Sequence, residues 1–266
     1  MRSYPCSNLK FFIGTLSILS IALLTSFALS YRASSRNVTR LGKLPGVIFW
    51  AWERPESLAH LESSRATTAF LSQTIYLRDD DAVVRPRLQP LRVAPGAPLI
   101  AVTRIESEDP LLSANQQSET VSAIIKSARL PDVIAVQIDF DATVSERSFY
   151  RDLLFALRKQ LPESTALSIT ALASWCKGDN WLDDLPIDEA VPMLFRMGQE
   201  RNQFLAALAS GESFQSRKCR GSVGISTDEP VTDLKFPERV YVFNSQSWSP
   251  ESTDELLRKI ENEKAP

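Results

Sequence analysis

Two aspartates that lie two positions apart form the segment of the sequence best suited to acid–base chemistry. The segment Val136–Asp141 reads VQIDFD, so strand alternation sends its three apolar residues to one face and Gln137, Asp139 and Asp141 to the other. Two neighbouring carboxylates titrate as a coupled pair in which one stays protonated near neutrality, as acid catalysis requires. The alternative is a structural pair, neutralised by Arg104 or Arg196.

Other segments that resemble strands also end in polar residues, and tryptophans lie close to several of these ends. The polar residues are Glu53, Arg104, Glu106, Arg196, Asn244 and Gln246, and the tryptophans are Trp50, Trp52, Trp175, Trp181 and Trp248. Flat aromatic rings beside charged and amide groups are typical of a sugar-binding site. We therefore predict Asp139, Asp141, Glu53 and Glu106 as catalytic candidates, and Gln137, Arg104, Trp175, Arg196 and Asn244 as substrate-binding residues.

The composition argues against several other kinds of function. His60 is the only histidine, and it is distant in sequence from any acidic cluster, so a metal site or a Ser/His/Asp triad lacks its parts. The formal net charge of −2 gives no basis for nucleic-acid binding. We expect no metal and no cofactor, and carboxylates must carry any proton transfer.

Eight short apolar runs indicate the elements that would position these residues. They are Val47 to Glu53, Ala69 to Arg78, Leu99 to Glu106, Val133 to Asp141, Ala166 to Trp175, Ala190 to Met197, Ser222 to Thr227 and Val240 to Ser245. Helical patterns fill several gaps, at Ser113 to Ala128, Glu146 to Gln160, Glu200 to Ala209 and Ser252 to Glu263. The alternation predicts an α/β fold, an imperfect (β/α)8 TIM-like barrel preceded by one N-terminal hydrophobic helix.

The alternative architecture is an open doubly wound sheet. Large residues at Phe49–Arg54, where a dinucleotide-binding loop needs glycines, argue against it. Between the second and third runs the sequence has no helical pattern. There a turn at Asp79–Asp81 and an extended stretch broken by prolines, Val83–Val93, predict a hairpin excursion.

The N-terminus predicts a membrane-targeting segment ahead of one soluble domain. Phe11–Ser30 is uncharged and about 20 residues long, the length that crosses a bilayer, so residues 1–30 are a signal peptide or a transmembrane anchor. Residues 31–45 read as a linker and residues 46–266 as the barrel domain. We expect the domain to lie in the cell envelope, on the periplasmic or outer side of the cytoplasmic membrane, either anchored or secreted.

Cys176 and Cys219 form an even pair in what we expect to be an oxidising compartment. A disulfide between them requires a loop to fold over, because Cys176 follows one predicted strand and Cys219 precedes another. Two buried free thiols are the alternative.

Several segments resemble a bacterial family of unknown function whose barrel is similar to those of glycoside hydrolases. They are Leu44–Glu53, Arg85–Arg92, Gln137–Ala142, Ser168–Cys176 and Asp188–Met193. The resemblance implies a TIM-type barrel and brings no established activity.

A more distant resemblance links Asp139 and Asp141 to the chitinase-like hydrolases, whose fourth strand reads Asp-x-x-Asp-x-Asp-x-Glu. Here the first Asp position is Val136 and the terminal Glu, the proton donor, is Thr143. The Tyr of their sixth strand corresponds to Phe195. Another carboxylate, from among Glu53, Glu106 and Glu146, must then donate the proton, or the barrel binds glycans without cutting them. Glu146 fits a helix-capping role better.

The leading interpretation is an exported barrel that hydrolyses a glycosidic bond in a bacterial polysaccharide by carboxylate acid–base catalysis. The alternative is a non-catalytic glycan-binding or cell-envelope scaffold barrel, and a weaker third is an enzyme of another carboxylate chemistry. The expected partners are a carbohydrate ligand and, through the N-terminal segment, a membrane.

Overall fold

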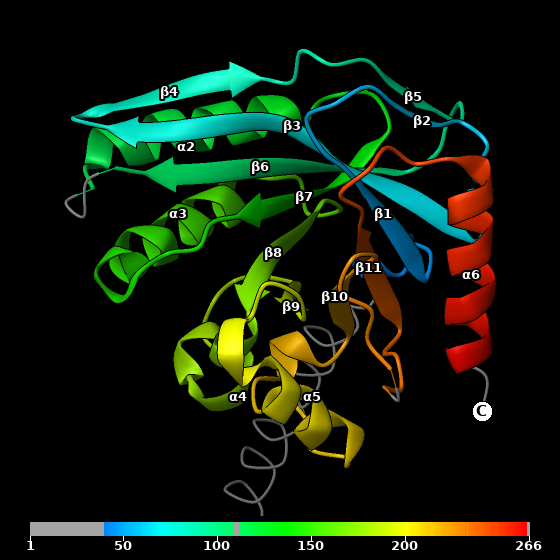
Figure 1. Cartoon of the computed structure of the whole chain (residues 1–266). Coiled ribbons are helices and arrows are strands. Elements are labelled where there is room, and N and C mark those ends of the chain that lie inside the picture. Colours follow the sequence, from blue (N-terminus) through cyan, green and yellow to red (C-terminus); the bar gives the residue numbers. More distant parts are fainter. Residues whose placement is uncertain (1–39, 109–111, 233, 265–266) are drawn as a thin grey trace, which may run out of the picture. The chain divides into compact units, whose positions relative to one another are not determined.

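The computed structural model describes residues 40–108, 112–232 and 234–264, and the barrel lies in the second of the chain's two units, Lys43–Pro266. Eight parallel strands close into a barrel because β1 (Val47–Ala51) pairs with both β3 (Ala66–Arg78) and β11 (Arg239–Phe243). Between β3 and β11 the order is β6 (Leu99–Ser107), β7 (Val133–Asp139), β8 (Ala166–Leu172), β9 (Glu189–Met193) and β10 (Ser222–Ser226) (Figure 1). The predicted TIM-like barrel is confirmed, and closure excludes the open sheet.

The helices that surround the barrel are uneven in length. They are α2 (Ala114–Ser127), α3 (Arg147–Gln160), α4 (Ala173–Gly178), α5 (Arg201–Ala209) and α6 (Pro250–Lys264). Within the part of the chain that the structure describes, no helix lies between β1 and β3, between β3 and β6 or between β10 and β11. The barrel is therefore imperfect, as expected.

The predicted hairpin excursion follows β3. This strand runs on past the barrel to Arg78, turns through Asp79 and Asp80, and pairs antiparallel with β4 (Asp81–Pro86). Asp79 adopts a positive φ of 52°, a conformation that aspartate tolerates in turns. Two short strands, β2 (Glu56–Leu58) and β5 (Leu91–Val93), pair beside the barrel. Figure 1 shows α2 lying along the extended β3 and β4.

The core between the strands and α2–α3 follows from strand and helix periodicity. Ile138 on β7 faces outward and is fully buried with Leu153, Leu154 and Leu157 of α3. Tyr150 is also fully buried there, whereas its neighbour Phe149 is only partly buried. Alternation thus leaves the other face of β7 for the barrel lumen.

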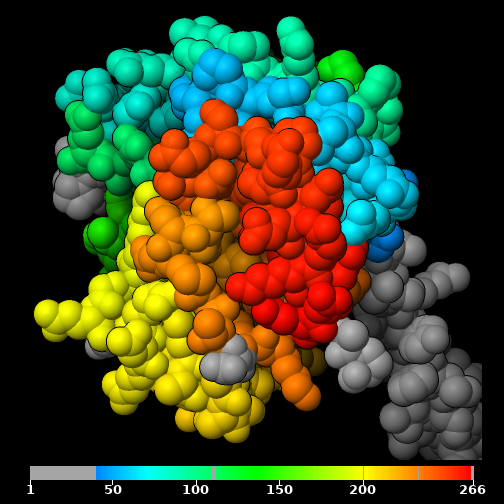
Figure 2. Space-filling view, turned by 45° about the vertical axis from the view of Figure 1, so that its right-hand side comes forward, coloured from blue at the N-terminus to red at the C-terminus, as the bar shows by residue number. Residues whose placement is uncertain are grey.

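On the other side of the barrel α6 completes the second core cluster. Leu257 and Ile260 are buried with Val47 and Val240. Figure 2 shows α6, in red, on the surface between the orange segment that precedes it and the first described part of the chain, in blue to cyan. Lys264, in the last turn, donates hydrogen bonds to the carbonyl oxygens of Gly46 (2.8 Å) and Glu238 (2.7 Å).

The hydrophobic segment Phe11–Ser30 lies outside the described residues. Among the residues that are described, no helix is long and apolar enough to cross a bilayer.

Candidate functional site

A cavity of about 640 Å³ opens at the carboxyl ends of the barrel strands. Its aromatic lining residues are Trp50, Trp52, Phe195, Phe204 and Phe243, and its charged lining residues are Arg104, Asp139, Asp141, Lys177 and Arg196. This is the end of a parallel barrel at which enzymes of this architecture place their sites. Cavities of this size accept small ligands.

The aromatic side of the cavity is built from rings that pack on one another. Phe195 and Phe243 are stacked with their ring centroids 5.6 Å apart and their planes at 9°. Trp52 meets Phe243 edge-on at 6.2 Å, and Trp50 meets Phe195 edge-on at 6.3 Å. The result is a rigid apolar wall along one side of the cavity.

Asp139 forms the carboxylate side of the cavity. It is 6 % exposed, its Oδ1 accepts a hydrogen bond from Thr170 Oγ1 at 2.7 Å, and its Oδ2 lies 3.2 Å from Arg104 Nη1. Burial raises the pKa of Asp139, and this effect outweighs the charge of Arg104 and the Thr170 hydrogen bond, both of which lower it. Asp139 therefore keeps a proton to higher pH than an ordinary aspartate.

Asp141 lies just beyond the end of β7, is exposed, and lines the same cavity. Its charge contributes to the raised pKa of Asp139. The structure thus brings Asp139, Asp141, Arg104 and Arg196 to the lining of one cavity.

Arg104 connects two cavities. Its Nε donates a hydrogen bond to Glu106 Oε1 at 2.8 Å, and it lines both the first cavity and a neighbouring one of about 510 Å³. Burial lowers the pKa of Arg104, but the hydrogen bond to Glu106 and the charges of Asp139, Glu106 and Asp141 raise it overall. The second cavity is also lined by Asp139, Asp141 and three glutamates, Glu106, Glu108 and Glu146.

None of the three glutamates of the second cavity lines the first one. Glu106 is held in its ion pair with Arg104. Glu146 is buried, and its Oε2 accepts hydrogen bonds of 2.6 Å from both the backbone N–H and the hydroxyl of Thr143. This is the capping role expected of Glu146.

The floor of the cavity is Trp50, which lies across the lumen. Its Nε1 donates a hydrogen bond of 2.8 Å to Gln137 Oε1, and Gln137 Nε2 donates one of 3.0 Å to Ser168 Oγ. A Cβ on Gly224 would come within 2.9 Å of the Trp50 ring, so a glycine on β10 makes room for it. Gln137 is fully buried beneath this floor and does not line the cavity, contrary to its predicted substrate-binding role.

Below the floor the buried ion pair of Arg239 and Glu189 occupies the barrel lumen. Arg239 Nε lies 3.0 Å from Glu189 Oε2, with side chains 4 % and 2 % exposed. Glu189 Oε1 accepts hydrogen bonds from Tyr241 Oη at 2.5 Å and from Ser168 Oγ at 3.2 Å. Burial, and then the Glu189 carboxylate, raise the pKa of Tyr241 well above its ordinary value, so the phenol remains a donor.

Three further predicted site residues lie elsewhere. Glu53 is exposed, and its carboxylate accepts hydrogen bonds from the backbone N–H groups of Leu88 (3.1 Å) and Gln89 (3.3 Å). Glu53 does not reach the cavity, because the chain turns outward after β1. Its carboxylate instead holds the loop after β4. Asn244 lines a separate cavity of about 300 Å³ beside α6, and its Oδ1 accepts a hydrogen bond from Thr227.

Trp175 is the third of these further predicted site residues, and it too lies outside the cavity. β8 ends at Leu172 and α4 begins at once at Ala173, so the strand alternation on which the prediction depended stops before Trp175. Trp175 is 4 % exposed and packs edge-on against Trp181 in the outer core, at 5.0 Å. It is a core residue and does not line the cavity.

Thr170, Lys177 and Phe243 line the cavity but are not among the site residues predicted from the sequence. Strand alternation could have found two of them, because Thr170 shares a face of β8 with Ser168, and Phe243 shares a face of β11 with Tyr241. Lys177 had no such signal, since it lies in the short helix α4.

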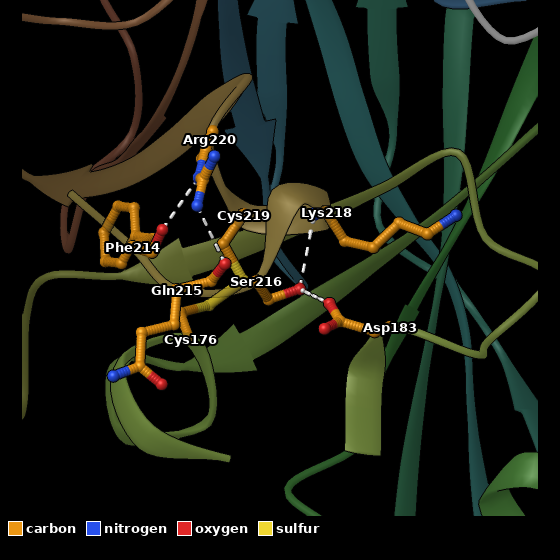
Figure 3. The surroundings of a disulfide bond; sticks show 8 residues. All are labelled: Cys176, Asp183, Phe214, Gln215, Ser216, Lys218, Cys219 and Arg220. Carbon is orange, nitrogen blue, oxygen red and sulfur yellow. Dashed lines mark hydrogen bonds between the residues drawn. A yellow bond between two sulfur atoms is a disulfide. The ribbon is translucent and has the colours of Figure 1, made fainter. Parts of the chain in front are cut away.

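The structure joins Cys176 and Cys219 by a disulfide, with Cα atoms 5.9 Å apart (Figure 3). The loop does fold over as this pairing requires: the segment after α5 returns to α4, where the Gln215 N–H donates to the Cys176 carbonyl at 2.9 Å. Figure 3 also shows Ser216, whose hydroxyl donates to Asp183 at 2.6 Å. The bridge fixes the helix that carries Lys177 into the cavity.

Among the described residues, no group of three or more histidine, cysteine or acidic side chains is arranged to hold a metal ion.

The fold and site define a TIM-like barrel with a mixed aromatic and charged cavity at its carboxyl end. Residues 95–194 match the family described as a domain of unknown function (DUF3142). This segment carries Arg104, Asp139, Asp141 and Thr170, whereas the aromatic residues Trp52 and Phe243 lie outside it. No curated protein and no solved structure matches the chain. The resemblance to glycoside hydrolases rests on the sequence motif alone.

Proposed function

We propose that the barrel binds a carbohydrate of a bacterial polysaccharide in the cavity at its carboxyl end and hydrolyses a glycosidic bond there. The observation that carries this proposal is the pairing of a rigid aromatic wall with a buried aspartate whose pKa is raised, Asp139. The wall suits the apolar face of a pyranose, and a carboxyl group that keeps its proton is the requirement for a general acid.

In the proposed reaction Asp139 gives its proton to the glycosidic oxygen as the bond from that oxygen to the anomeric carbon breaks. Asp141, the other cavity carboxylate, either takes a proton from the attacking water, which inverts the anomeric configuration, or attacks the anomeric carbon to form a glycosyl–enzyme ester. In the second course Asp139, now ionised, takes a proton from a water that displaces Asp141 from the anomeric carbon, so the configuration is retained overall. Arg104 stabilises the Asp139 carboxylate that remains, since it lies 3.2 Å away.

The test is the release of reducing ends from bacterial envelope polysaccharides by the full-length chain, purified in a detergent without a sugar headgroup. Asp139→Asn and Asp141→Asn should each lower the rate by on the order of a hundred-fold or more, because each removes an acid–base group and preserves its shape. Asp152→Asn is the matched control, since Asp152 is exposed on α3. Full activity in both cavity variants would contradict the proposal.

A second candidate is a glycan-binding barrel without catalysis. Among the described residues, Asp139 and Asp141 are the only carboxylates that line the first cavity, and Asp139 is held by Arg104 and Thr170. A structural role for Asp139 is consistent with those contacts. Saturable oligosaccharide binding by the wild-type chain with no release of reducing ends would favour this function.

We also propose that the domain is exported and that its N-terminal segment binds a membrane. The disulfide between Cys176 and Cys219 supports export, because such bonds persist in oxidising compartments. Alkaline phosphatase joined after Pro266 should be active in a bacterial host, since that enzyme needs its own disulfides. An inactive, stably expressed fusion would contradict export.

A further inference from the structure

We propose that the sugar bound in this cavity is acidic, and that its carboxylate is bound by Arg196 with Lys177 as a second cation. This inference rests on the proposed carbohydrate function and specifies its substrate class. The charges in the cavity are separated along its rim: the two carboxylates, Asp139 and Asp141, belong to β7 and its end, whereas Lys177 and Arg196 follow β8 and β9. One ligand can therefore meet both signs of charge.

Arg196 is held in an unusual backbone conformation. Its φ is 54°, in the left-handed region that arginine rarely adopts, and its N–H donates to both carboxylate oxygens of Glu229, at 3.2 and 3.1 Å. Non-glycine residues in this region cluster at functional sites, where surrounding contacts hold them. The Glu229 carboxylate thereby fixes the backbone from which the arginine side chain extends.

The guanidinium group of Arg196 lies over the wall of the cavity. Its Cζ is 5.2 Å from the centroid of the Phe243 ring, and the side chain lines the cavity. Among the described residues, no carboxylate lies within ion-pair distance of this guanidinium group. A guanidinium that stacks on an aromatic ring keeps its edge free to bind a carboxylate through two parallel hydrogen bonds.

Lys177 supplies the second cation on the same side. Its Nζ is 5.4 Å from the centroid of the Phe204 ring and 3.5 Å from Glu212 Oε2. Glu212 is exposed and does not line the cavity, so that ion pair is weak and open to competition.

Two other carboxylates lie close to Arg196 on the solvent side. Asp228 accepts a hydrogen bond from Ser226, which lowers its pKa, and the charge of Arg196 contributes to the same shift. Glu229 is 3.3 Å from Arg201 Nε as well as bound to the Arg196 N–H. Neither carboxylate lines the cavity. Within the cavity, Arg104 is already paired with Asp139, and Asp141 is the only other carboxylate among the described residues that line it.

The experiment measures the affinity of the full-length chain for uronate oligosaccharides from polygalacturonate, alginate and hyaluronan, each beside its carboxyl-reduced neutral counterpart. Affinities are measured by titration calorimetry on the Asp141→Asn variant, because this substitution slows hydrolysis of the ligand. At least one acidic oligosaccharide should bind about ten-fold or more tightly than its reduced form, as expected for a hydrogen-bonded charge pair. The preference should decrease as salt is raised.

Variants of Arg196 in this background assign the effect to that residue. Arg196→Gly should fold with an unchanged or higher melting temperature, because glycine relieves the left-handed conformation, yet should lose the preference for the acidic form. Arg196→Lys keeps a positive charge and should retain part of the preference. Arg129→Gln is the control, since Arg129 is exposed beyond α2 and does not line the cavity.

The outcomes separate this inference from the function on which it depends. Equal binding of acidic and reduced oligosaccharides overturns the acidic substrate class and leaves carbohydrate binding in place. A preference that survives Arg196→Gly overturns the role of Arg196. Binding of no oligosaccharide in the panel, acidic or reduced, overturns both proposals.

Discussion

Loss of the arginine below the cavity floor should destabilise the barrel strongly. Arg239→Met keeps the length of the side chain but removes the cation that lies 3.0 Å from Glu189. The carboxylate of Glu189 would then remain in a site that is almost fully buried, with only neutral donors from Tyr241 and Ser168. An uncompensated buried charge of this kind costs about 3–5 kcal/mol.

For a domain of this length each kcal/mol shifts the melting temperature by about 2–4 °C, so the variant should melt about 6–20 °C below the wild type. The assay is thermal unfolding followed by circular dichroism at pH 7.

A double variant sharpens the result. Adding Glu189→Gln to Arg239→Met removes both charges, so the double variant should be more stable than Arg239→Met alone. Arg129→Met is the control for loss of an exposed arginine and should change stability little. A loss of stability below about 1 kcal/mol in Arg239→Met, or no recovery in the double variant, would refute the view that Arg239 compensates the buried charge of Glu189.

Two further predictions concern stability. Reduction of the Cys176–Cys219 bond, which spans a sequence separation of 43, should cost about 4 kcal/mol on the chain-entropy estimate. Urea unfolding with and without reductant measures this cost, and an unchanged midpoint would contradict it. Burial raises the pKa of Asp139, so its contribution to stability is fully present below the unfolded pKa of about 3.9 and is lost as pH rises through the folded value. Asp139→Asn should therefore gain stability relative to the wild type as pH rises from 3 to 7, and a relative loss over that range would count against the assignment.

The barrel could be predicted well from the sequence because apolar residues recur along it with the periods of strands and helices. Each of the eight apolar runs corresponds to one barrel strand, and the helices at α2, α3, α5 and α6 lie where their patterns placed them. Closure of the sheet also depends on pairing between the first and last strands, which alternation alone does not reveal. In the structure β1 pairs with both β3 and β11, and this closes the barrel.

The site was predicted only in part, because alternation gives the face of a residue and not its depth. Gln137 and Asp139 share a face of β7, yet Gln137 lies beneath Trp50 and only Asp139 reaches the cavity. Alternation also fails where a strand ends. Trp175 was misplaced because α4 begins directly after Leu172, and Glu53 because the chain turns outward after β1.

The most direct test of the central claim is a crystal structure of the full-length Asp141→Asn variant soaked with an oligosaccharide that it binds. We expect a sugar ring packed against Phe195 and Phe243, with an oxygen of the ligand within hydrogen-bonding distance of the Asp139 carboxyl group. A sugar bound in the separate cavity beside α6, or bound in the predicted cavity without contact to Asp139, would contradict it.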